Sequence, residues 1–105
     1  MEQVKIIEID FKNITSCNDF YGQLKSKIKL PDYFGNNLDA LYDVLTGYIR
    51  LPLILHFTNL NLNRIDDMFD LFNTFDDAAE ATDYDFSYIC TLDRDKLTVE
   101  DIEYL

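Results

Sequence analysis

Hydrophobic and polar positions in the first third of the chain predict a strand followed by an amphipathic helix. Lys5 to Asp10 alternates in polarity and is rich in isoleucine, a pattern typical of a strand. In residues 16–28, apolar side chains recur every three or four positions, as they do on one face of a helix. Leu30-Pro31 is expected to end this helix, because the residue before a proline is disfavoured in the α conformation.

A loop and a second helix follow. The segment 31–37, Pro-Asp-Tyr-Phe-Gly-Asn-Asn, indicates a loop. Asn37 is expected to cap the next helix, and Asp39 in the first turn suits the positive end of the helix dipole. Gly47 is expected to end this helix. The apolar stripe of this second helix consists of Leu38, Leu41, Val44 and Leu45.

The second half of the chain continues the alternation of strands and helices. Residues 51–57 form a continuous apolar run, which predicts a strand buried on both faces. A polar loop with one helical turn is expected over 58–63. Apolar residues at helical spacing predict a long third helix over 65–81, and residues 86–92 predict a third strand.

Strands that alternate with helices predict parallel pairing through right-handed crossovers. The expected fold class is therefore α/β, a three-stranded parallel sheet packed with helices in two layers. A length of 105 residues fits a single domain, residues 1–105. Residues 93–105 are expected to be an acidic C-terminal extension, in which Thr98-x-x-Asp101 is a weak capping signal for a short final helix.

The charge balance restricts the partners. Twenty aspartates and glutamates face nine lysines and arginines, for a formal net charge of −11. Such a polyanion should repel nucleic acid and anionic membranes and should attract basic partners. Acidity can also serve solubility alone, so the charge by itself does not choose between these interpretations. Hydrophobic residues make up 48% of the chain, which is enough for a packed core.

The cysteines and the single histidine indicate no metal site. Cys17, Cys90 and His56 have no zinc-binding spacing, and free, buried thiols in a reducing cytosol are the expectation. The start of the chain runs straight into a strand pattern, so we expect no signal peptide. Apolar runs are too short to span a membrane. We therefore expect a cytoplasmic protein without a cofactor.

Two aspartates carry the clearest candidate chemistry. Asp39 and Asp43 are four residues apart and share one face of the second helix, where their charges repel each other. A basic partner would compensate that repulsion, and nearby tyrosines suit a protein interface. The alternative is an ordinary solvated helix face. Gly35 could allow the close approach of a partner or only serve a turn.

A long segment of this region resembles a known family. Residues 30–43 read Leu-Pro-Asp-Tyr-Phe-Gly-Asn-Asn-Leu-Asp-Ala-Leu-Tyr-Asp, and the match continues through Val-Leu-Thr-Gly-Tyr at 44–48 to Pro-Leu-Ile-Leu at 52–55. This pattern is similar to the signature of the barstar family, intracellular inhibitors of ribonucleases. The resemblance implies a three-stranded parallel sheet with helices, in agreement with the pattern above. It also implies that the loop and the second helix enter a ribonuclease active site.

The resemblance further implies which residues contact a partner. Asp43 falls on the aspartate that takes the place of the substrate phosphate. A further carboxylate on the last long helix of the family is matched by Asp77, with Thr74 one turn earlier. The other matched positions are Tyr33, Gly35, Asn37, Leu38, Asp39, Tyr42, Gly47 and Tyr48.

The chain departs from the family pattern at several of these positions. Tyr42 and Tyr48 stand where the family has tryptophan, and this sequence contains no tryptophan. Asp77 replaces a glutamate, and Val44 occupies a family cysteine position. Because such differences set specificity, they bear on the identity of the partner.

Three hypotheses follow. The first is an immunity or antitoxin protein that binds a basic ribonuclease or ribonuclease toxin domain as a monomer in a 1:1 complex. The second keeps the acidic binding surface but assigns it to a toxin that is not a ribonuclease, or to a regulatory protein. The third, a hydrolase that uses Asp39 and Asp43, is disfavoured because no nucleophile or phosphate-loop motif accompanies the pair. We expect no enzyme activity.

Overall fold

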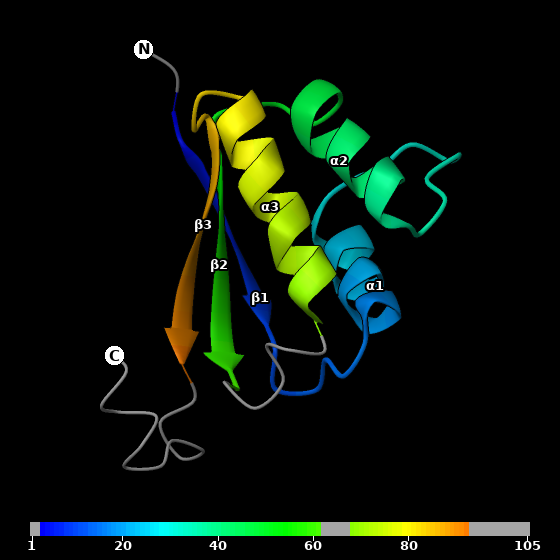
Figure 1. Cartoon of the computed structure of the whole chain (residues 1–105), viewed down its shortest axis with the longest axis vertical. Coiled ribbons are helices and arrows are strands. Elements are labelled where there is room, and N and C mark those ends of the chain that lie inside the picture. The colour runs from blue at the N-terminus through cyan, green and yellow to red at the C-terminus, as the bar shows by residue number, and fades with distance from the viewer. Residues whose placement is uncertain (1–2, 62–67, 93–105) are drawn as a thin grey trace.

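A computed structural model describes residues 3–61 and 68–92 of the chain. The helices and strands follow one another in the expected order (Figure 1). They are β1 (Lys5–Asp10), α1 (Cys17–Lys27), α2 (Leu38–Gly47), β2 (Leu53–Leu60), α3 (Phe69–Ala81) and β3 (Phe86–Leu92). The expected final helix and the residue Ile65 lie outside the described residues.

The three strands form one parallel sheet in the order β1-β2-β3. Ile7, Leu55 and Tyr88 stand in register across it. The helices form a single layer against this sheet, with α3 next to the strands and α1 and α2 beside it (Figure 1). The prediction of an α/β fold with a three-stranded parallel sheet and two layers is confirmed.

The central strand differs from its prediction in two ways. Leu53, Leu55 and Phe57 are fully buried under the helices, but Ile54 and His56 between them are only half-buried. The expectation of burial on both faces is therefore wrong, because helices cover one face of the sheet only. On the uncovered face, Ile6 keeps 64% of its surface exposed.

Strand β2 also begins two residues later and ends later than predicted. It extends to Leu60, through residues that the sequence assigned to a polar loop. Pairing with β3 continues to Leu60 and Leu92 after an irregularity that follows Phe57. Asn59 has a left-handed backbone there, with φ 55°, and its amide donates a hydrogen bond to Asp10 Oδ1 at 3.0 Å. Tertiary pairing thus overrides the polar local sequence.

Aromatic rings hold the two layers together. Phe57 on β2 has ring contacts with Phe11 at 5.0 Å, Phe75 on α3 at 5.1 Å and Tyr88 on β3 at 5.6 Å between centroids. The Tyr88 hydroxyl donates a 2.6 Å hydrogen bond to Asp76 of α3. Burial raises the pKa of Tyr88 well above its ordinary value, and the bond to Asp76 adds to this.

The start of α2 is fixed by its cap, as the sequence predicted. The side-chain oxygen of Asn37 accepts a 2.7 Å hydrogen bond from the backbone N–H of Ala40, and its amide donates to the carbonyl of Gly35 at 3.3 Å. The left-handed residue of the loop is Asn36, with φ 51°, and not a glycine. A Cβ on Gly35 would lie 2.9 Å from the Asn37 amide, so this glycine leaves room for the cap.

The cysteines only partly follow expectation. Both thiols are free, but Cys17 is half-buried and Cys90 is exposed, so the prediction that both are buried is wrong. Cys90 stands on an edge strand that no further strand covers among the described residues. Partial desolvation and the nearby charge of Asp76 raise the pKa of its thiol.

Phe57→Ala tests the aromatic core. Removing this buried ring should lower the free energy of unfolding by about 3–5 kcal/mol, because the core loses the contacts of the ring and a cavity remains. Phe69→Ala is a matched control, since Phe69 is 61% exposed and its loss should cost within about 0.5 kcal/mol. Urea unfolding followed by circular dichroism measures both. Equal losses would contradict the assignment of the core.

Asn37→Ala tests the cap of α2. The loss of the side-chain acceptor should lower the free energy of unfolding by about 1 kcal/mol. Asn37→Asp retains an acceptor at the N-terminus of the helix and should lose less than half as much. The same urea titration compares the two variants. If both lose stability equally, the cap does not act through its oxygen.

Candidate partner-binding site

A hollow of about 740 Å³ lies between the 31–37 loop and α2. We call it the acidic hollow, because Asp39 and Asp43 line it and no lysine or arginine of the described residues does. Seven of the residues predicted to contact a partner line this one hollow. They are Tyr33, Gly35, Asn37, Asp39, Asp43, Gly47 and Tyr48.

The two carboxylates owe their direction to the packing of α2. Leu41, Val44 and Leu45 are buried in the core, so the opposite side of the helix faces outward. Asp39 and Asp43 are both exposed and, four residues apart, lie on the same side of the helix. Neither side chain has an ion pair or a hydrogen bond within the described part of the chain. Both are therefore free to accept bonds from a partner.

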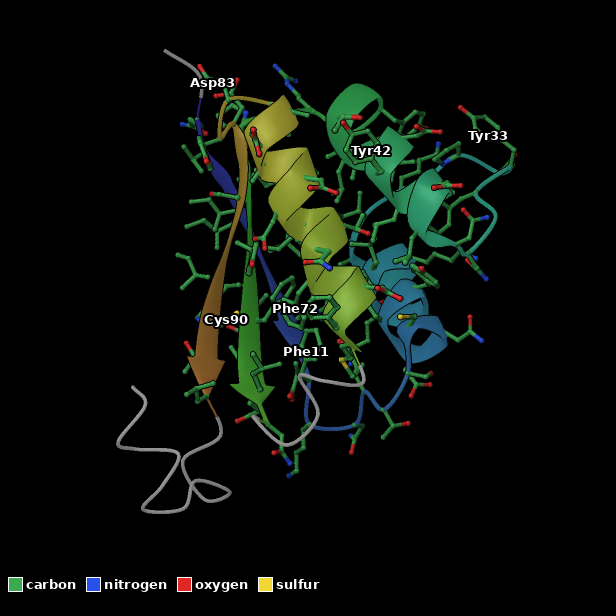
Figure 2. All side chains as sticks on the ribbon, viewed as in Figure 1. Phe11, Tyr33, Tyr42, Phe72, Asp83 and Cys90 are labelled. Atoms are coloured by element: carbon green, nitrogen blue, oxygen red, sulfur yellow. The ribbon has the colours of Figure 1, made fainter. Side chains whose placement is uncertain are left out.

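Two tyrosines add apolar area beside these charges. Tyr33 in the loop is 83% exposed and Tyr48, just after α2, is 48% exposed. Figure 2 shows Tyr33 extending outward from the loop, away from the rest of the molecule. Large exposed aromatic rings beside charged side chains are typical of protein–protein interfaces.

Four of the predicted contact residues lie outside the acidic hollow. Leu38 lines a neighbouring hollow of about 470 Å³ together with Cys17 and Tyr21 of α1. Tyr42 is half-buried, packs against the core, and lies on the side of α2 that faces α3 (Figure 2). Thr74 and Asp77 are on α3 and are described next.

Helix α3 packs against α2 and carries Asp77, the carboxylate that the resemblance matches on this helix. Of its adjacent aspartates, Asp76 is held by the Tyr88 hydroxyl, whereas Asp77 is exposed and has no bonded partner among the described residues. Thr74, one turn earlier, is half-buried and donates to the backbone carbonyl of Asp70 at 2.9 Å. Of the two adjacent aspartates, Asp77 is thus the one free to accept a bond from a partner, and Thr74 already uses its hydroxyl hydrogen.

Sequence reasoning missed Thr46, which also lines the acidic hollow. Its hydroxyl donates a 2.8 Å hydrogen bond to the carbonyl of Tyr42. The spacing could have predicted this, because positions 39, 43 and 46 follow one another at helical intervals of four and three and therefore share one face. Gly47 is the last residue of α2 and does not have the left-handed conformation of a glycine that ends a helix.

The surroundings of the two aspartates hold no histidine. His56 lies on the half-buried, helix-free side of β2, and its Nε2 is 2.8 Å from the Thr91 hydroxyl. Within residues 3–61 and 68–92, no three histidine, cysteine or acidic side chains gather where they could hold a metal ion. No described helix has the length and apolar character needed to cross a membrane.

Two comparisons with known proteins identify the family of this chain. The family model described as "Barstar (barnase inhibitor)" matches residues 4–93. A curated protein of Bacillus subtilis (strain 168), named "Putative ribonuclease inhibitor YrdF", is 38% identical over 94 residues, which cover 85% of this chain and 98% of that protein. The match spans all six described helices and strands. The chain belongs to the barstar family.

Proposed function

We propose that this chain is an immunity or antitoxin protein that binds a basic ribonuclease, or a ribonuclease toxin domain, and covers its active site. The observation that carries the proposal is the acidic hollow, in which two unpaired aspartates stand beside two exposed tyrosines. Membership of the barstar family supports a ribonuclease-inhibitor-like role. The ribonuclease is therefore the partner that this surface fits best.

Carboxylates suit this task because a ribonuclease active site is built to hold a phosphate. Such a site offers cationic side chains in a concave, partly desolvated pocket. A carboxylate is a compact anion that accepts paired hydrogen bonds from arginine. In the proposed complex, Asp43 occupies the place of the substrate phosphate and Asp39 is the second anchor. The partner's cations also remove the repulsion between these two aspartates.

The tyrosines and α3 complete the proposed interface. Tyr33 and Tyr48 are rigid rings that lose little side-chain entropy on binding, and their hydroxyls can bond at the edge of the contact. Asp77 on α3 adds a third free carboxylate beside α2. The net charge of −11 attracts a basic ribonuclease over longer distances, and added salt weakens this attraction.

The proposed setting follows from the task. A cell that makes a ribonuclease must protect the RNA in its own cytoplasm, so the chain would act there. In this proposal the free chain is a monomer, and it forms a 1:1 complex with the ribonuclease. Because Tyr42 and Tyr48 replace the tryptophans of the family pattern, the cognate enzyme is expected to differ in shape from that of other family members.

Asp43→Asn tests the mechanism without changing the size of the side chain. Basic ribonucleases encoded beside the gene are titrated with the chain, and the inhibition constant is measured from RNA hydrolysis. The variant should inhibit at least about 30-fold more weakly, as for a central interface residue worth about 2 kcal/mol. Inhibition should weaken because the variant lacks the negative charge that faces the phosphate-binding cations of the ribonuclease.

Asp83→Asn is the matched control for this test. It removes the same charge from the turn between α3 and β3, far from Tyr33 (Figure 2). Asp83 has φ 54°, which asparagine tolerates, so the control should fold normally. Its inhibition constant should change less than about threefold, since only the long-range field is altered. Unchanged inhibition by the Asp43 variant, or equal losses in both variants, would contradict the mechanism.

A further inference from the structure

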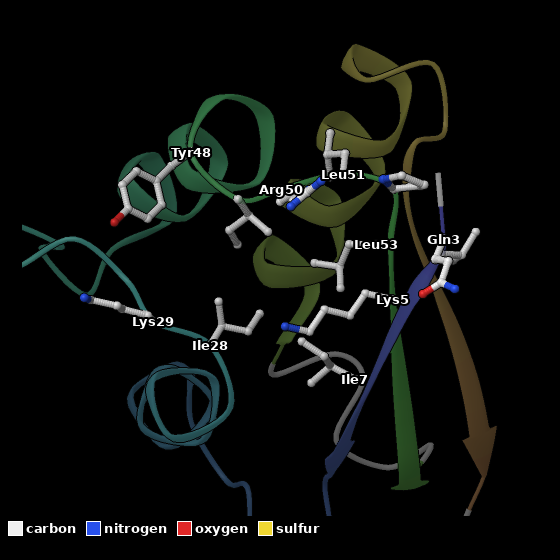
Figure 3. A pocket seen from close by; sticks show the side chains of 12 residues that line it. Gln3, Lys5, Ile7, Ile28, Lys29, Tyr48, Arg50, Leu51 and Leu53 are labelled. Atoms are coloured by element: carbon white, nitrogen blue, oxygen red, sulfur yellow. The ribbon is translucent and has the colours of Figure 1, made fainter. Parts of the chain in front are cut away.

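A second hollow, of about 930 Å³, lies at the edge of the sheet where β1 and β2 begin. It is bounded by the start of β1, the segment after α1, and the segment between α2 and β2 (Figure 3). We call it the basic hollow, because Lys5, Lys29 and Arg50 line it. These are three of the six lysines and arginines in residues 3–61 and 68–92.

No acidic side chain of the described residues compensates the three cations in this hollow. In a chain with 20 acidic residues, no aspartate or glutamate of the described ranges lines this hollow. The side chains of Lys5, Lys29 and Arg50 make no ion pair and no hydrogen bond there. Like charges that share a hollow repel one another unless an anion lies between them. Figure 3 shows Lys5 and Arg50 extending over the hollow, whereas Lys29 lies on the side away from β1 and its amine is directed away from the other two.

Part of the wall beneath these cations is apolar. Leu53 is fully buried and Ile7 nearly so, and both line the hollow together with half-buried Ile28 and Ile49. Tyr48 adds an aromatic ring at one side (Figure 3). A hollow of this size that combines apolar and polar lining is in the range of small-molecule sites. The charges suit an anionic group, and the walls suit an apolar or aromatic body.

We propose that the basic hollow binds a small organic phosphate, a molecule with one phosphate group attached to a flat or apolar body. Arg50 can bond two phosphate oxygens at once, Lys5 supplies a second charge over the hollow, and Lys29 adds charge at its rim. A single phosphate fits better than a longer polyanion, because the overall charge of −11 repels anions outside the hollow.

This site is separate from the acidic hollow. Only Tyr48 lines both, and the charges of the two are opposite. The proposal therefore goes beyond ribonuclease inhibition and is tested on the chain alone. A failure of the inhibitor role leaves it unaffected, and its own failure leaves the inhibitor role unaffected.

The experiment titrates the full chain with adenosine 5′-monophosphate, with adenosine and with inorganic phosphate, by calorimetry and by amide NMR. The monophosphate should bind saturably, with a Kd at least tenfold lower than that of either fragment. Amide shifts should concentrate at Lys5, Lys29 and Arg50. The amides of Asp39 and Asp43, which line the acidic hollow and not the basic one, should not move.

Arg50→Gln and Lys27→Gln form the matched pair of variants. Arg50 and Lys27 are both exposed and unbonded in their side chains, so neither variant should unfold the protein, and only Arg50 lines the basic hollow. Arg50→Gln should raise the Kd for the monophosphate at least fivefold, and Lys27→Gln less than twofold. Equal effects of the two variants would show diffuse electrostatics only. The proposal would be overturned by equal effects of the two variants, by equal affinity for inorganic phosphate and the monophosphate, or by the absence of saturable binding.

Discussion

The rotation of α2 about its own axis controls the surface that this protein offers to a partner. Leu41, Val44 and Leu45 are buried, and each such burial is worth about 1.5–3 kcal/mol, so the helix has one strongly preferred orientation. Asp39 and Asp43 must then share the opposite, solvent-facing side. The Asn37 cap fixes where the helix begins and links it to the loop that carries Tyr33. Core packing therefore positions the charges of the acidic hollow.

Much of this arrangement could be predicted from the sequence, because it depends on local periodicity. The order of strands and helices, the cap at Asn37 and the shared face of Asp39 and Asp43 all follow from spacing. The rest depends on contacts that are distant in sequence. The strand β2 continues through Asn59 because β3 pairs with it, and Tyr42 lies toward α3 because the two helices pack. Cys90 is exposed because it lies on the edge strand.

The two hollows show that net charge describes this molecule poorly. A value of −11 predicts a basic partner, yet it conceals a local group of cations at Lys5, Lys29 and Arg50. At physiological ionic strength the charges of exposed groups are screened over about 8 Å, so each hollow acts largely through its own side chains. Tyr48, which lines both hollows, is the point where they meet. The overall field attracts a partner, and the local groups decide what binds.

The central claim is that Asp43 takes the place of a substrate phosphate in a ribonuclease active site. Competition with a mononucleotide that occupies that site tests it most directly. The apparent Kd of the chain for the ribonuclease should rise in proportion to the mononucleotide concentration, without a plateau, and it should do so equally for the Arg50→Gln chain. An unchanged Kd, with mononucleotide, ribonuclease and chain in one ternary complex, would contradict the claim.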